Sequence, residues 1–222
     1  MSLNSQTNFF EFLSYRADEI IRLLFEHIQI TGFAVLLAIL IGVPIGIFIT
    51  RKEKCANIII GIANIFQTLP SLALFGLIIP FLGIGITPSI FVLFLYALLP
   101  IIKNTYIGIN SVDPSIIEAG KGMGMKSSQI LRMVELPLAL PMIMGGIRIS
   151  TVINIGTATI ASLIGAGGLG DLIFKGISMN DSYLTLAGAI PTSLLAIGAD
   201  TLLGMIENAL VPKGIAKVQR DG

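Results

Sequence analysis

The apolar runs along this chain are long and continuous, and short polar segments separate them. A helix needs roughly 20 apolar residues to cross a hydrocarbon core of about 30 Å, whereas a membrane barrel shows short alternating segments. The runs predict an all-α, polytopic membrane protein with five transmembrane helices, at about 27–50, 57–81, 88–110, 138–164 and 183–211. Five spans in 222 residues leave no room for a second folded domain, so residues 1–222 are expected to form a single transmembrane domain.

The composition agrees with a bilayer environment. Hydrophobic residues make up 54% of the chain and charged residues 12%, whereas soluble domains average about 25% charged residues. We therefore expect a multi-pass protein surrounded by lipid, with no nucleic acid among its partners.

The basic residues predict the orientation of the chain, because loops rich in Lys and Arg tend to stay on the cytoplasmic side of a membrane. Ten of the 14 basic residues follow the first span, surround the connection between the third and fourth spans, or follow the fifth: Arg51, Lys52, Lys54, Lys103, Lys121, Lys126, Arg132, Lys213, Lys217 and Arg220. This distribution places the N-terminus outside and the C-terminus inside.

The segment at 9–28 precedes the first span and mixes aromatic with charged residues at helical spacing. One interpretation is an amphipathic helix that lies on the outer membrane surface. The other is a plain extension of the first span.

The chain has few residues suited to catalysis or metal binding. It contains one cysteine, Cys55, in a basic loop, and one histidine, His27, at the outer end of the first span. Neither a disulfide framework nor a His/Cys metal site can be built from them, so we interpret them as a surface thiol and an interfacial imidazole. We expect no catalytic residue, no metal and no cofactor in this chain.

The glycines include one match to a nucleotide-binding pattern. The stretch GAGGLG at 165–170 matches the dinucleotide pattern G-x-G-x-x-G, but it follows a membrane helix and not the strand of a βαβ unit. A tightly turned outer loop explains these glycines better, because glycine tolerates positive φ angles. The chain also lacks the P-loop pattern G-x-x-x-x-G-K followed by Ser or Thr. Any ATP that energises this protein must therefore bind another subunit.

A hydrophilic segment at about 113–137 interrupts the apolar chain between the third and fourth spans. Asp113 and Pro114 suit the N-cap and the first position of a short helix. Glycines at 120, 122 and 124 weaken that helix by about 1 kcal/mol each relative to alanine, so it should end there. We predict a second short helix that begins at Ser127 or Ser128 and is redirected into the fourth span at Pro137.

This segment resembles the EAA loop in the transmembrane subunits of bacterial ABC importers, whose pattern is E-A-A, three residues, G, nine residues, I, one residue, L-P. Gly120 stands where the pattern has its second Ala, and Val134 where it has Ile. An amphipathic connector without a partner explains the polarity of the segment but not this spacing. The resemblance implies that the loop docks into a groove of an ATPase subunit, and the residues that match or replace the pattern's small and apolar positions are Glu118, Ala119, Gly120, Gly124, Leu136 and Pro137.

The resemblance extends over most of the chain, through 65–85, 97–109, 135–152 and 155–177. These stretches are similar to the permease subunits of osmoprotectant importers, which carry glycine betaine, carnitine and choline. The resemblance implies a type I ABC importer permease (MetI-like) fold in the bacterial cytoplasmic membrane. It also implies two ATP-binding cassette subunits that carry ATP and Mg, a second permease copy or homologue, and a separate extracytoplasmic solute-binding protein. The alternatives are a permease for another trimethylammonium compound such as ergothioneine, and a stand-alone secondary carrier.

Two charged residues inside the predicted spans suggest an ion pair. Arg148 lies 11 residues beyond Pro137, and Asp200 lies 11 residues before Val211, so both should sit at the same depth from the inner ends of their helices. We predict that they pair. The pair would either fix the packing of the fourth and fifth spans, or take part in gating or proton relay; a secondary carrier would use Glu207 with them.

Polar residues also interrupt the second and fourth spans. Pro70 frees a backbone carbonyl in the second span, and such a break is tolerated only against protein or a wet cavity. Either these polar residues line the translocation path, or they form hydrogen bonds between helices. The residues we assign to the path are Gln67, Thr68, Ser71, Asn154 and Thr157.

Overall fold

The computed structural model describes residues 8–210, and within that range every regular element is a helix and none is a β-strand. Four helical runs are long and apolar enough to cross a membrane: α2 (Ala17–Ile49), α5 (Ile86–Asn110), the continuous run Ser127–Ile164 and α10 (Ser182–Leu210). A bent pair, α3 (Glu53–Thr68) and α4 (Ser71–Leu82), provides a fifth if it crosses as one span. The predicted all-α polytopic class is confirmed, with four to five spans.

The first span begins earlier than the prediction of residue 27. Helix α1 (Phe9–Tyr15) ends at Arg16, whose φ of −104° and ψ of 12° break the helix, and α2 then runs unbroken from Ala17. Residues 17–28 are therefore an extension of the span. The separate α1 packs on the start of α10, where the ring centroids of Phe9 and Tyr183 lie 5.6 Å apart.

The second span is broken where its polar residues predicted an interruption. Leu69 and Pro70 are extended, with ψ angles of 134°, and the axes of α3 and α4 differ by 100°. The hydroxyl of Tyr96, from α5, donates a hydrogen bond to the Leu69 carbonyl at this bend. The bend is thus supported by protein, which is the condition for irregular backbone at membrane depth.

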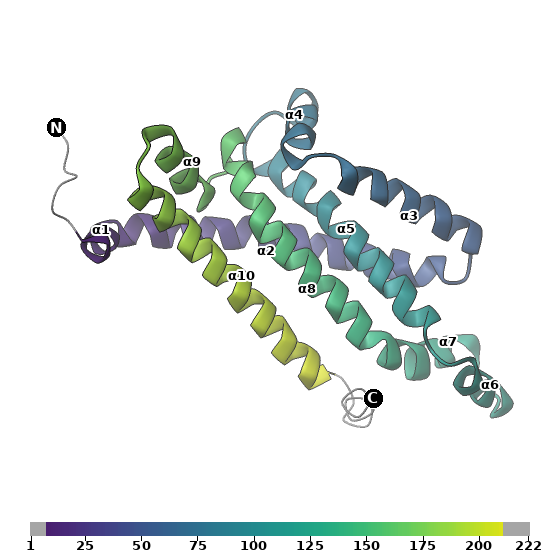
Figure 1. Cartoon of the computed structure of the whole chain (residues 1–222). Helices are drawn as coiled ribbons and strands as arrows, with labels where there is room; N and C mark the ends of the chain where they lie inside the picture. The colour runs from purple at the N-terminus through teal and green to yellow at the C-terminus, as the bar shows by residue number, and fades with distance from the viewer. Residues whose placement is uncertain (1–7, 211–222) are drawn as a thin grey trace.

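Helices α2, α5 and α8 (Leu136–Ala161) form the centre of the bundle. Small residues let their backbones approach closely: a Cβ on Gly146 of α8 would lie 2.8 Å from the Pro100 carbonyl oxygen of α5. Helix α10 lies along α8, and the short helices gather at the two ends of the bundle (Figure 1). Helices α6 (Pro114–Gly122) and α7 (Ser127–Ile130) lie at one end, and α1 and α9 (Gly170–Met179) lie towards the other (Figure 1).

The glycine-rich connection between α8 and α9 is a tight loop, as predicted. A short 3₁₀ turn (Ser162–Ile164) ends α8, and Gly165, Gly167 and Gly168 then have φ angles of 83°, 78° and 82°. Positive φ angles of this kind favour glycine, because a Cβ would clash with the backbone.

Candidate functional site

The segment that resembles a coupling loop folds as two short helices. The Ser115 N–H donates to Asp113 Oδ1 at 2.8 Å, and this bond holds the pKa of the Asp113 carboxyl below its usual value. Helix α6 begins at Pro114 and ends at Gly122, and Gly124 turns the chain with a φ of 80°. Helix α7 begins at Ser127. The predicted helix, turn and second helix are all present.

Helix α6 packs against α7 through Gly120. Its backbone carbonyl accepts a hydrogen bond of 3.1 Å from the Met125 N–H, and the residue is buried. A Cβ built on Gly120 would lie 3.4 Å from Met125 Sδ and 3.5 Å from Ile130 Cγ1, which are ordinary van der Waals distances. The alanine that the resembled pattern has at this position would therefore fit.

The predicted change of direction at Pro137 is wrong, because helix α7 passes into α8 without a break. A π-helical turn (Leu131–Glu135) joins the two helices, and the whole run Ser127–Ile164 is one continuous element of 38 residues. Proline lacks an N–H and clashes with the carbonyl four residues earlier, so the wider π turn just before Pro137 relieves both problems. Helix α7, in the segment that resembles a coupling loop, is thereby the end of a rod long and apolar enough to span a membrane.

The six assigned coupling residues lie in different surroundings. Glu118, Ala119 and Gly124 are exposed at the end of the bundle, whereas Gly120 is buried beneath them. Leu136 and Pro137 are half-buried at the start of α8. Beside them lies a cleft of about 630 Å³, which is lined by Glu118, Lys121, Ser127, Ile130, and Arg51 from the end of α2. Glu118, Ala119 and Gly124 are therefore the members of this set most accessible to a partner.

Arg148 of α8 lies against two carboxylates of α10. Its Nε and Nη2 donate to Asp200 Oδ1 and Oδ2, both at 2.9 Å, and its Nη1 donates to Glu207 Oε2 at 2.9 Å. The structure thus brings together the residues that the sequence suggested as partners. The three side chains are 33%, 41% and 21% exposed, so the cluster lies at the edge of the chain and not in its core.

The residues assigned to the translocation path lie at two places, the bend between α3 and α4 and helix α8. Gln67, Thr68 and Ser71 flank the bend between α3 and α4, next to the buried cluster that includes Ala158 of α8. Asn154, one turn earlier in α8, is fully buried, and neither atom of its side-chain amide has a hydrogen-bond partner. The Thr157 hydroxyl donates to the Ile153 carbonyl at 2.9 Å, within its own helix.

Comparison with known proteins shows the family of this chain. Residues 42–212 match the family described as "Binding-protein-dependent transport system inner membrane component". The chain belongs to this family. It is therefore a permease subunit of an ABC transporter, located in the inner membrane and not itself catalytic.

Two curated relatives from Bacillus subtilis (strain 168) are similar over nearly their whole length. The choline transport system permease protein OpuBB is 47% identical over 209 residues, which cover 94% of this chain and 96% of the relative. The glycine betaine/carnitine/choline transport system permease protein OpuCB is 47% identical over 204 residues, covering 92% and 94%. The permease of the MetNI methionine ABC transporter has the same fold, with a TM-score of 0.79, 24% identity, and coverage of 87% and 96%.

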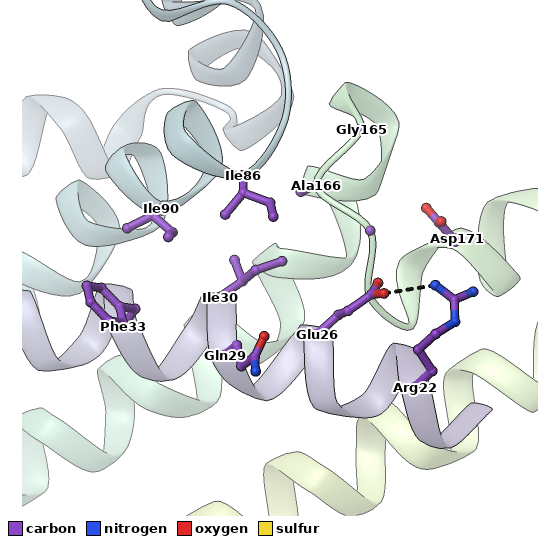
Figure 2. Close-up of a pocket in the computed structure, with 11 residues that line it drawn as sticks. Arg22, Glu26, Gln29, Ile30, Phe33, Ile86, Ile90, Gly165, Ala166 and Asp171 are labelled. Atoms are coloured by element: carbon purple, nitrogen blue, oxygen red, sulfur yellow. Dashed lines mark hydrogen bonds and ion pairs between the residues drawn. The ribbon is translucent and has the colours of Figure 1, made fainter. Parts of the chain in front are cut away.

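The permease has a second cavity, of about 700 Å³, which is lined by α2, the start of α5 and the glycine loop at 165–167 (Figure 2). Glu26 of α2 links this helix to the glycine loop. Its carboxylate accepts a hydrogen bond from Arg22 Nη1 at 2.9 Å and another from the Gly168 N–H at 3.1 Å. A Cβ on Gly167 would lie 2.6 Å from Glu26 Oε2. The glycine loop is therefore held tightly against α2.

Asp171 lines the same cavity from the first turn of α9 (Figure 2). Burial raises the pKa of its carboxyl, Lys175 opposes this shift, and Glu26 adds to it. Within residues 8–210 the structure contains no group of three His, Cys, Asp or Glu side chains placed to bind a metal ion.

Sequence reasoning placed one residue of this region wrongly. His27 is not an interfacial imidazole: it is 1% exposed, and its Nε2 donates to the Ile155 carbonyl of α8 at 3.0 Å. Helix α2 begins at Ala17, ten residues before the predicted start of the span, so His27 lies within it, and the packing of α2 against α8 buries its ring.

Glu135, which directly precedes α8, was not among the residues predicted from the sequence. This residue is buried and pairs with Arg51. Its spacing was a usable signal, since Glu135 lies four residues before Ala139 and eight before Ile143, on the face of α8 that is buried.

Proposed function

We propose that this permease forms the pore of an ATP-driven importer for quaternary ammonium osmoprotectants of the glycine betaine, carnitine and choline type. The observation that supports this most strongly is the likeness, over nearly the full length of each chain, to permeases named for those solutes. The path residues around the bend between α3 and α4, and Thr157 of α8, are the surfaces along which the solute would pass, whereas Asn154 is buried inside the bundle.

Two ATP-binding cassette subunits dock on the coupling helices and bind the ATP and Mg. The exposed Glu118, Ala119 and Gly124 offer a small, accessible surface at the end of the bundle, which supports this role. ATP binding draws the two ATPases together, and α6 and α7 pass that movement to the spans, which reorient between inward-open and outward-open states. The energy enters as the different affinity of the ATPases for the two states.

The pore contains two permeases, either two copies of this chain or this chain and a homologue. The N-terminus lies outside and the end with α6 and α7 lies in the cytoplasm. Seven of the ten basic residues that predict this orientation lie between Arg51 and Arg132, and the other three, Lys213, Lys217 and Arg220, lie outside the described residues.

A separate extracytoplasmic binding protein delivers the solute and sets its identity. Quaternary ammonium groups are held best in aromatic cages that include tryptophan, and this chain has no Trp. The permease itself therefore offers only a weak, transient site.

The first test is purification of the tagged chain from its native membrane in mild detergent, followed by mass spectrometry of the proteins that accompany it. We expect an ATPase, which is lost when Glu118 and Gly124 are both replaced by bulky residues. Whether a second permease is present shows in the same experiment. A chain that purifies alone, with uptake that survives deletion of every ATPase partner, contradicts the proposal and supports a secondary carrier.

The solute is tested by uptake of labelled choline, carnitine, glycine betaine and ergothioneine into cells that carry this importer alone. Uptake of the first three supports the proposed substrate class. Uptake of ergothioneine alone supports the alternative, a permease for another trimethylammonium compound.

A further inference from the structure

Glu135 is a carboxylate in an unusual place. Its side chain is 2% exposed, at the end of α8 that adjoins the coupling helices. A buried charge is costly unless it is paired and hydrogen-bonded, so the position of this residue needs a partner.

The π turn places Glu135 on the buried face of the rod. Ile130 of α7 is buried, and the next buried residue along the chain is Glu135, five residues later. A regular α-helix turns by about 100° per residue, so a spacing of five would bring these side chains to different faces. The i to i+5 pattern of a π turn aligns them, and the buried stripe then continues at α-helical spacing through Ala139 and Ile143.

The partner comes from a distant part of the chain. Arg51 follows the end of α2 and donates from Nη2 to Glu135 Oε2, across 84 residues of sequence. The Arg51 side chain is 53% exposed, so the pair has one end in solvent and one end in the protein. Both residues line the cleft that also contains Glu118 and Lys121 of the coupling helix α6.

We propose that the pair between Arg51 and Glu135 positions the coupling helices, by fastening α2 to the rod of α7 and α8 where that rod leaves the bundle. This inference rests on the proposed function, in which α6 and α7 receive the movement of the ATPases. With the pair intact, a displacement of α7 moves the inner ends of α2 and α8 together. Without it, α7 can move against α2, and ATP hydrolysis is no longer converted fully into transport.

The two members of the pair differ in what their removal leaves behind. Glu135→Gln leaves an exposed arginine that water can solvate, whereas Arg51→Gln leaves a buried carboxylate without its cation. Arg51→Gln should therefore lower the thermal stability of the permease more than Glu135→Gln does. Both changes should weaken coupling, because each breaks the same link.

The experiment uses the whole importer, reconstituted in liposomes with its ATPase and its binding protein, and measures solute molecules imported per ATP hydrolysed. We expect Arg51→Gln and Glu135→Gln to keep the ATPase bound at the wild-type stoichiometry and to lower this ratio about tenfold. Lys54→Gln is the matched control, since Lys54 is an exposed cation three residues later, in the first turn of α3, and makes no salt bridge within the described part of the chain. The control should keep the wild-type ratio.

The double variant Arg51→Gln/Glu135→Gln separates a shared link from two independent effects. The double variant should import as many solute molecules per ATP hydrolysed as the single variant with the lower ratio, because the link can be lost only once. Three outcomes overturn the inference: wild-type ratios in both single variants, losses that add in the double variant, or release of the ATPase from either single variant while the wild type retains it. A wild-type chain that recruits no ATPase overturns the proposed function itself, and the inference with it.

Discussion

Arg148 and Asp200 face each other across α8 and α10, with both oxygens of the carboxylate bound to the guanidinium at 2.9 Å. The two residues are 52 positions apart in the sequence, and Glu207 binds the third donor of the same arginine. A cation and two anions thus meet at the edge of the permease, within helices that otherwise carry no charged side chain. Paired contacts of this geometry are stronger and more directional than a single hydrogen bond.

Removing the cation from this cluster should harm the permease more than removing one anion. Asp200→Asn leaves Arg148 bonded to Glu207, whereas Arg148→Ala leaves two carboxylates near each other without a cation. We expect thermal unfolding in detergent to occur at a lower temperature for Asp200→Asn and lower again for Arg148→Ala. If the cluster serves packing alone, uptake per folded molecule stays at the wild-type level; a gating role lowers uptake without a change in stability. An Asp200→Asn variant with normal assembly, stability and uptake would show that the pair does neither.

The bend between α3 and α4 should depend on the hydroxyl of Tyr96. Tyr96→Phe removes the donor to the Leu69 carbonyl and nothing else, so we expect a loss of about 1 kcal/mol in the free energy of unfolding. Faster hydrogen exchange of the amides in the first turn of α4 should accompany the loss. Tyr15→Phe is the control, because Tyr15 is 92% exposed. Equal stability of the two variants would contradict a supporting role for this hydrogen bond.

Alanine should be tolerated at Gly120, within helix α6, but not at Gly124, in the turn that follows this helix. A Cβ fits at Gly120 with ordinary contacts, so Gly120→Ala should stabilise α6 by about 1 kcal/mol and leave ATPase binding unchanged. Gly124 has a φ of 80°, so Gly124→Ala should cost about 1–2 kcal/mol through backbone strain. Gly122→Ala, with no atom near the added Cβ, is the control for helix propensity alone. Thermal unfolding measures the change in stability, and recovery of the ATPase measures the change in binding. A Gly124→Ala variant as stable as the wild type would contradict a turn that requires a positive φ at this residue.

Asp171 should make the stability of the permease depend on pH. Burial raises the pKa of its carboxyl above 3.8, so the folded state favours the protonated form. The stability that this group contributes is therefore fully present below pH 3.8 and is lost as the pH rises through the raised pKa. Relative to Asp171→Asn, the wild-type chain should become more stable as the pH falls from neutral towards 3.8. Unfolding of both proteins across this range tests the sign, and a constant difference between them would contradict it.

Several features could be predicted from the sequence because they depend on neighbouring residues. Apolar runs give the number and approximate position of the spans, since the thickness of the bilayer sets their length. Asp113, Pro114 and Gly124 act on the backbone where they stand, and the bounds of α6 and α7 follow from them. The contact between Arg148 and Asp200 was also within reach, because residue counting gives the depth of each charge and a charge at that depth needs a partner.

Other features follow only from how the helices pack. The 100° bend between α3 and α4, the burial of His27 and Asn154, and the pairing of Arg51 with Glu135 each depend on the rotation of one helix against another. A shift of one residue turns a helix by about 100°, so sequence periodicity that places a span correctly in the bilayer does not say which neighbour a given side chain meets. The sequence by itself determined the class of protein, the approximate position of its spans and the two short helices of the 113–137 segment, because these depend on bilayer thickness and local backbone preference. Only the tertiary structure decided how that segment is fastened to the spans, because that link joins residues 84 positions apart.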